Sequence, residues 1–204
     1  MLSKSASNAL LKTLEEPPAH VVFILATTEP RKIPETVLSR CEVFTFKKPS
    51  QEVLKKMIVS VAKKEGFVLN EVSTELIAIL GDGSFRDTQG IIQKIISYSK
   101  DKKITEEEVR LVTGAPAVEL VHGVVSAIAN KDLNLGLQSV KKAVSQNIDM
   151  SVFLKLIIHT TRAVLLVRFS AGDLVKDELS TKEFEFVSDL AKKDGVFSSQ
   201  TLVE

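Results

Sequence analysis

Three polar residues in this sequence are of types that bind phosphate groups. Thr28 follows the apolar run 21–25, and Arg40 lies in the Ser-Arg-Cys triplet at 39–41. Arg86 follows the Gly-Asp-Gly-Ser segment at 81–84, which is typical of a turn leading into a helix. A hydroxyl group can hydrogen-bond a phosphate oxygen, and a guanidinium group neutralises charge that develops during phosphoryl transfer. The three side chains therefore indicate phosphate chemistry.

Each of these residues also has a purely structural interpretation. Threonine is common at strand ends, and a lone arginine after a short helix is ordinarily a surface ion-pair partner. The position of Arg40 beyond Thr28, with Pro30 and Pro34 between them, favours the functional interpretation of both. Arg86 is predicted in the first turn of a helix, where a cation is unfavourable to the helix dipole. Helix stability alone would therefore not select an arginine there.

Other catalytic and metal-binding chemistry finds little support in the sequence. No Gly-x-x-x-x-Gly-Lys-Thr phosphate loop occurs. The single cysteine, Cys41, has no histidine near it in sequence, so we expect a small buried residue rather than a nucleophile. The three histidines lack metal-ligand spacing. Lysine pairs at 47–48, 55–56 and 63–64 have no interleaved aromatic residues, which favours solvated helix faces over a DNA track.

The composition is that of a globular protein of the cytoplasm. The chain has 204 residues, which could form one large domain or two to three small ones, and 44% of them are hydrophobic, which is enough for real cores. Its formal charge of +1 gives no general attraction to nucleic acid. One cysteine excludes an internal disulfide and suits a reducing compartment. The N-terminus lacks the apolar segment of a signal peptide, and the apolar stretches are too interrupted to predict a membrane span.

The hydrophobic pattern predicts a mostly α fold in three regions. Residues 3–14 have helical spacing before two prolines, whereas 21–28 and 43–46 are apolar enough for buried strands. Two strands and two short helices cannot form a whole α/β domain, so residues 1–48 are interpreted as the C-terminal part of one. A small helical bundle is predicted for 49–114, and a second, incomplete all-α region for 115–204.

Capping residues place the starts of several helices. Ser50 is a good N-cap, Thr105 with Glu108 forms a predicted capping box, and Asp149 precedes a long apolar helix at 150–170. Such a helix is expected inside a bundle or an oligomer interface. Ser180 with Glu183 predicts a further capping box. Residues on the predicted buried stripes of the last region are Leu120, Val121, Val124, Val125 and Ile128, then Leu133, Leu137, Val140 and Val144.

These features together resemble the later part of a AAA+ protein of the bacterial clamp-loader family. The resemblance rests on Thr28, on the triplet at 39–41, on the run Asn-Ala-Leu-Leu-Lys-Thr-Leu-Glu-Glu-Pro-Pro at 8–18 and on Gly-Ser-Phe-Arg-Asp at 83–87. It implies that 1–48 end a nucleotide-binding domain, that 49–114 form its lid and that 115–204 form an incomplete collar. It also implies that Thr28 and Arg86 are nucleotide sensors and that Arg40 is an arginine finger acting in trans.

The resemblance further implies part of the ATPase motor that loads the sliding clamp onto DNA for the replicative DNA polymerase III. ATP and Mg²⁺ would bind the full-length subunit. Because a phosphate loop and its acidic companion motif are missing from this sequence, we expect the chain alone to bind nucleotide weakly and to be inactive. Expected partners are other clamp-loader subunits through 115–204, with the clamp and primer–template DNA contacted through the complex, and no membrane. The alternatives are a nucleotide-free δ′-like member or a stand-alone helical assembly module.

Overall fold

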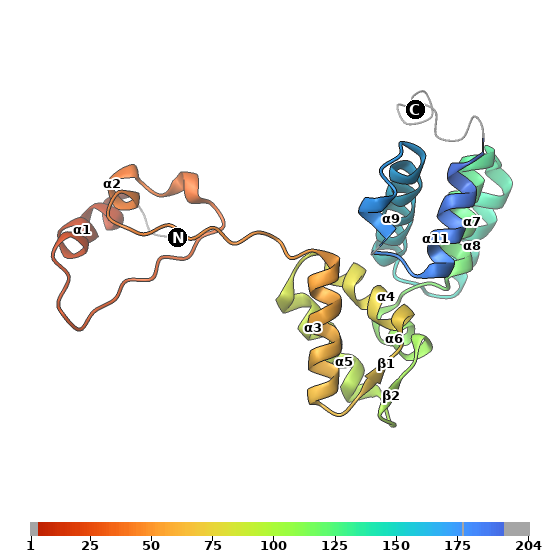
Figure 1. Ribbon diagram of the computed structural model, residues 1–204, viewed down its shortest axis with the longest axis horizontal. Coiled ribbons are helices and arrows are strands. Elements are labelled where there is room, and N and C mark those ends of the chain that lie inside the picture. The colour runs from red at the N-terminus through yellow and green to blue at the C-terminus, as the bar shows by residue number, and fades with distance from the viewer. Residues whose placement is uncertain (1–3, 177, 194–204) are drawn as a thin grey trace. The chain divides into compact units, whose positions relative to one another are not determined.

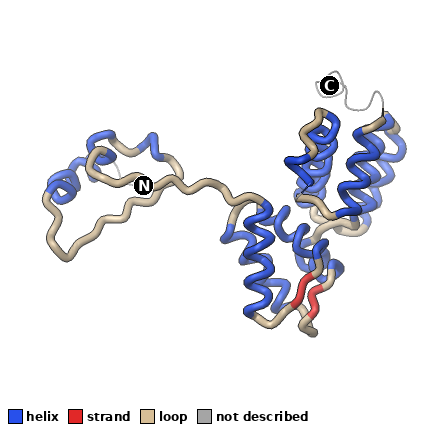
Figure 2. The backbone as a smooth tube through the Cα atoms, viewed as in Figure 1, coloured by secondary structure: helices blue, strands red, loops and turns tan. Residues whose placement is uncertain are grey.

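The computed structural model describes residues 4–176 and 178–193 and divides into two compact units, residues 1–47 and 48–204. Most of the described chain is helical, and the two strands are only two residues long each (Figure 2). The prediction of a mostly α fold is therefore confirmed. Each unit is described by itself.

The first unit holds short helices joined by long connections without regular structure (Figure 1). Helix α1 spans Lys4–Glu15 and ends before Pro17, because proline cannot continue the helical hydrogen-bond ladder. A 3₁₀ helix spans Pro30–Lys32, and helix α2 spans Glu35–Leu38 and packs near α1. Arg40 lies in the turn that follows α2.

The strands predicted at 21–28 and 43–46 are not present. Both segments lack regular structure, and several of their apolar side chains are exposed, including Ile24 at 88% and Phe46 at 93%. A strand in the middle of a sheet needs hydrogen-bond partners on both edges. Within residues 4–47 the structure has no strand that could provide them. The apolar composition of these segments is therefore not sufficient to form strands here.

The second unit begins with helices whose N-caps are local side chains. Helix α3, Gln51–Lys64, is capped by Ser50, whose Oγ accepts a hydrogen bond from the Val53 amide at 3.3 Å. Strand β1, Val68–Leu69, follows Gly66, which has a φ of +77° that suits glycine. Helix α4, Glu71–Gly81, is capped by Asn70. The predicted start of α3 is thus confirmed.

A second pair of helices completes the first core. Helix α5 spans Phe85–Tyr98, and strand β2, Lys103–Ile104, pairs in parallel with β1. Helix α6 spans Glu106–Thr113 and has the predicted capping box between Thr105 and Glu108. The core they share is built from buried aliphatic side chains, which are Leu54, Ile58, Ile77, Ala78, Ile92, Ile95, Ile104 and Val109.

Helices α7 and α8 pack closely through small residues. Helix α7 spans Val118–Asn130 and helix α8 spans Leu133–Ser145. A Cβ atom on Gly123 would lie 2.5 Å from Oγ of Ser139, and one on Gly136 would lie 3.3 Å from Cβ of Ala127. The two backbones can approach this closely only because these positions carry little or no side chain.

This packing corrects the predicted inner face of α8. Leu133, Leu137 and Val144 were expected in the core, but they are 73%, 58% and 57% exposed. Ser139 and Ala143 are buried instead. Close approach to α7 favours small residues on the inner face, so Leu133, Leu137 and Val144 lie on the outside. Val140 packs against the core, as predicted.

The last helices surround a second core. Helix α9 spans Met150–Arg168 and is capped by Asp149, as predicted, through hydrogen bonds from the Ser151 and Val152 amides at 2.8 and 3.1 Å. Helix α10 spans Asp173–Lys176 and helix α11 spans Thr181–Ala191. Helix α9 packs against α7 and α11. The largest fully buried side chain of this core is that of Phe153.

By length and composition alone, helix α9 could cross a membrane. The sequence pattern did not predict this, because its apolar stretches are too interrupted to indicate a span. Its buried side chains, Phe153, Leu156, Thr160, Ala163 and Val164, lie in the bundle among helices. A core helix of a globular bundle passes the same test.

The contact between Gly81 and Thr88 yields a stability prediction. A Cβ atom on Gly81 would lie 2.0 Å from Oγ1 and 3.0 Å from Cβ of Thr88, a fully buried side chain. Gly81→Ala should therefore lower the free energy of unfolding by roughly 1–3 kcal/mol in urea denaturation. Gly90→Ala is the control, because its Cβ would meet nothing within 4 Å. Gly90→Ala should stabilise helix α5 by about 0.5–1 kcal/mol. Equal effects of Gly81→Ala and Gly90→Ala on the free energy of unfolding would contradict the packing argument.

Candidate functional site

Arg40 is held by neighbouring groups of the first unit. Its Nε donates a hydrogen bond to Oε1 of Glu15 at 2.9 Å, and its Nη2 also pairs with that carboxylate. Its Nη1 donates to the carbonyl oxygen of Thr36 at 2.7 Å and to Oγ of Ser39 at 3.2 Å. The side chain of Arg40 is 35% exposed. The guanidinium therefore lies at the surface with its plane fixed by these acceptors.

Thr28 lies in an exposed bend after the segment that was predicted as a strand. Its neighbour Thr27 makes the local hydrogen bond there, because Thr27 Oγ1 accepts from the Glu29 amide at 2.9 Å. Glu29 in turn pairs with Lys32 at 2.8 Å. Within residues 4–47, no hydrogen bond joins Thr28 to Arg40. The hydroxyl of Thr28 is thus available at the surface.

Arg86 belongs to the second unit, in the first turn of α5. Ser84 caps this helix by accepting a hydrogen bond from the Asp87 amide at 3.2 Å. Arg86 is exposed, and within the described residues its guanidinium makes no hydrogen bond or ion pair. The fold gives this arginine no structural partner.

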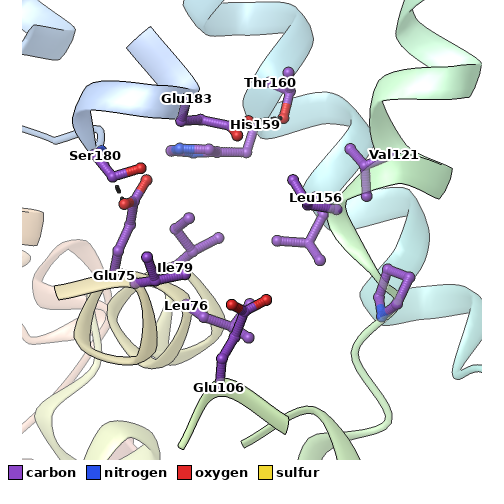
Figure 3. Close-up of a pocket in the computed structure, with 13 residues that line it drawn as sticks. Glu75, Leu76, Ile79, Glu106, Val121, Leu156, His159, Thr160, Ser180 and Glu183 are labelled. Atoms are coloured by element: carbon purple, nitrogen blue, oxygen red, sulfur yellow. Dashed lines mark hydrogen bonds between the residues drawn. The ribbon is translucent and has the colours of Figure 1, made fainter. Parts of the chain in front are cut away.

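The structure also contains a cavity that the sequence did not predict. It has a volume of about 90 Å³ and lies among helices α4, α7, α9 and α11 (Figure 3). Most of its wall is apolar. Its polar side chains are Glu75, Glu106, His159, Thr160, Ser180 and Glu183. All except Glu106 gather at one end of the cavity (Figure 3).

Glu75 is the most buried acid of this group. Its side chain is on α4, it is 5% exposed, and its Oε2 accepts a hydrogen bond from the Ser180 amide at 2.9 Å. Burial raises the pKa of Glu75 to about 7, although the nearby charge of Lys55 and the Ser180 hydrogen bond oppose this shift. Glu75 therefore caps the N-terminus of α11 from a different helix.

Glu183 connects two other helices beside Glu75. Its Oε2 lies 2.9 Å from Nε2 of His122, and its Oε1 accepts a 3.4 Å hydrogen bond from Thr160. The ring of His122 stacks on Phe186 at a centroid separation of 3.5 Å. Burial lowers the pKa of His159, whose Nε2 is buried without a hydrogen-bond partner in the described residues. The neutral form of His159 is thus favoured.

The capping box predicted for Ser180 and Glu183 is wrong. The side chain of Ser180 makes no capping hydrogen bond to α11. The Ser180 amide is satisfied by Glu75, and Glu183 is engaged by His122 and Thr160. A local motif could not reveal this arrangement, because the partners lie on α4, α7 and α9. Among the residues that the structure describes, no group of three or more His, Cys, Asp or Glu could hold a metal ion.

Comparison with known proteins identifies the class to which the chain belongs. The family described as "DNA polymerase III, delta subunit" matches residues 1–50. The DNA polymerase III subunit tau of Bacillus subtilis is 36% identical over 172 residues, which are 84% of this chain and 30% of that protein. The tau subunit of Escherichia coli is 32% identical over 181 residues, or 87% of this chain and 27% of that protein. These matches place the chain in the bacterial clamp-loader family.

Within this family, the chain is a relative of the gamma and tau subunits. The DNA polymerase III subunit gamma of Buchnera aphidicola is 38% identical over 133 residues, 65% of this chain and 36% of that protein. The chain therefore spans about a third or less of the lengths of these relatives. A solved structure, the Bacillus subtilis DNA clamp loader delta protein, is 18% identical with a TM-score of 0.45, over 100% of this chain and 64% of that one.

The buried position of Glu75 leads to a prediction on pH. Its folded-state pKa of about 7 lies above the ordinary 4.5, so between these pH values the native state binds more protons than the unfolded state. The stability contribution of this residue therefore falls as pH rises, by roughly 3 kcal/mol in total. Glu75→Gln should stabilise the protein increasingly relative to wild type between pH 5 and pH 8.

Urea denaturation at several pH values measures this difference. Glu71→Gln, in the exposed first turn of the same helix, is the matched control and should give a nearly constant difference from wild type. A constant difference for Glu75→Gln as well would show that the carboxyl group of Glu75 is not destabilised by burial.

Proposed function

We propose that this chain is part of the ATPase motor subunit of the bacterial clamp loader, which loads the sliding clamp onto DNA for DNA polymerase III. The observation that carries the proposal is 36% identity to a tau subunit over 84% of the chain. The same chain contains an exposed Thr28, Arg40 and Arg86. These residues are surface groups that the packing of either core does not require.

In this proposal, Arg40 is an arginine finger that acts on ATP bound to a neighbouring subunit. Its guanidinium would stabilise charge on the transferring phosphoryl group. Thr28 and Arg86 would contact the nucleotide bound in the full-length subunit. Through Arg86, nucleotide binding would be coupled to the position of the lid. ATP and Mg²⁺ are the cofactors of that full-length subunit. Cytoplasmic localisation follows from the same role in replication.

The two helical parts of the second unit would have different tasks. We assign residues 49–114 to the lid and residues 115–204 to the collar that joins subunits. Two exposed apolar faces support an assembly role for residues 115–204. One lies on α8 around Leu133 and Leu137, and the other lies on α9 around Leu154 and Ile158. The partners would be other clamp-loader subunits, with clamp and primer–template DNA bound by the whole complex.

A substitution of Arg40 tests the catalytic part of the proposal. In the assembled loader, Arg40→Ala should lower ATP turnover by about a thousandfold or more and leave nucleotide affinity nearly unchanged, because the finger acts on the transition state. Arg31→Ala is the control, since Arg31 is exposed in the same unit without a side-chain partner among the described residues. Equal losses of affinity and turnover would mark Arg40 as a structural residue.

A pair of double substitutions on α9 tests the assembly part. Leu154 and Ile158 are 57% and 58% exposed, whereas Leu156 and Val164 are 8% and 0% exposed. Leu154→Glu with Ile158→Glu should reduce self-association in sedimentation while circular dichroism stays helical. Leu156→Glu with Val164→Glu, on the same helix, should unfold the bundle because it buries two charges. A wild-type chain that remains monomeric at high concentration would refute the assembly role.

A further inference from the structure

The guanidinium of Arg40 has few free hydrogen-bond donors. An arginine side chain carries five N–H groups. Nε and Nη2 both donate to Glu15, and Nη1 donates to the Thr36 carbonyl and to Ser39 Oγ. Four donors are therefore occupied within the first unit, which leaves one N–H on Nη2.

Glu15 and a phosphate group would compete for the same edge of this guanidinium. A phosphate binds arginine best through two parallel N–H donors. The edge formed by Nε and Nη2 supplies such a pair, and the carboxylate of Glu15 already occupies it. The carboxylate also neutralises the positive charge that a transferring phosphoryl group would need. Both effects oppose binding of a second anion to Arg40.

We propose that Glu15 inhibits Arg40 by holding its guanidinium group in a resting position. The phosphate oxygens of a nucleotide bound to a neighbouring subunit would displace the Glu15 carboxylate and so release Arg40. The proposal rests on the proposed role of Arg40 as an arginine finger. It adds a means of regulation within the same site. The release of Glu15 then becomes part of forming the active subunit interface.

The location of Glu15 favours this role over a local one. It is the last residue of α1, where the helix dipole disfavours a carboxylate. Its neighbour Glu16 is exposed and makes no side-chain hydrogen bond or ion pair within the described residues. Only one of two adjacent glutamates therefore faces Arg40. This gives the chain a matched control.

The strength of the pair is suited to reversible inhibition. The side chains of Arg40 and Glu15 are 35% and 49% exposed, so water and salt screen the attraction. Exposed ion pairs of this kind contribute no more than about a fivefold change in an equilibrium constant. A multiply charged phosphate group can overcome a contact of that strength.

The first test measures how accessible Arg40 is in the chain as it exists. Phenylglyoxal modifies free guanidinium groups, and peptide mass spectrometry can follow Arg40 with Arg31 as an internal reference. Glu15→Gln should raise the rate at Arg40 about two- to fivefold, whereas Glu16→Gln should leave it unchanged. Circular dichroism of both variants checks that α1 is retained. Equal rates at Arg40 in both variants would overturn the inference.

The second test measures ATP turnover in the assembled loader without clamp or DNA. Glu15→Gln should increase turnover about two- to fivefold, and Glu16→Gln should not. No change or a decrease in Glu15→Gln, with Arg40→Ala still inactive, would overturn the inhibitory role and leave the proposed function intact. If Arg40→Ala retained full turnover, the proposed function itself would be wrong and the inference would fail with it.

Discussion

Ser180, the N-cap residue of helix α11, is half-buried, and its backbone amide needs a hydrogen-bond acceptor. Glu75 on α4 provides one by accepting from the Ser180 amide at 2.9 Å. The Glu75 carboxylate is buried at this contact, and the loss of its hydration is why its pKa rises. The fold tolerates the cost because an unpaired amide at the same place would also be unfavourable. The contact between Glu75 and Ser180 thus joins α4 to the start of α11.

Two lysine side chains make further hydrogen bonds to backbone atoms of distant segments. Nζ of Lys55 donates to the carbonyl oxygen of Glu178 at 2.7 Å, and Nζ of Lys155 donates to that of Leu80 at 2.9 Å. Helix α4 also supplies side chains to both cores, Ile77 to one and Ile79 to the other. Hydrogen bonds from charged side chains to backbone atoms, together with the shared helix α4, therefore join the parts that we assign to the lid and the collar.

The residues of the proposed function take no part in these contacts. Thr28 and Arg86 are exposed, and Arg40 is satisfied by acceptors within its own unit. Nothing in the two cores requires these residue types. Such surface positions suit groups that act on a nucleotide or a neighbouring subunit rather than on the stability of the fold.

Local sequence determined the helices of this protein and many of their ends. Ser50, Thr105 and Asp149 cap their helices as predicted, because an N-cap bond joins residues only two or three positions apart. The mostly α architecture and the position of Arg86 in the first turn of a helix could be predicted for the same reason, since both depend on the pattern of nearby residues.

Tertiary structure decided the features that need a distant partner. The segments 21–28 and 43–46 are not strands, because strand formation requires a second backbone alongside. Ser180 and Glu183 do not form a local capping box, because Glu75 and His122 reach them from other helices. The outward face of α8 and the pairing of Glu15 with Arg40 were likewise fixed by close approach in space, which periodicity along the chain does not encode.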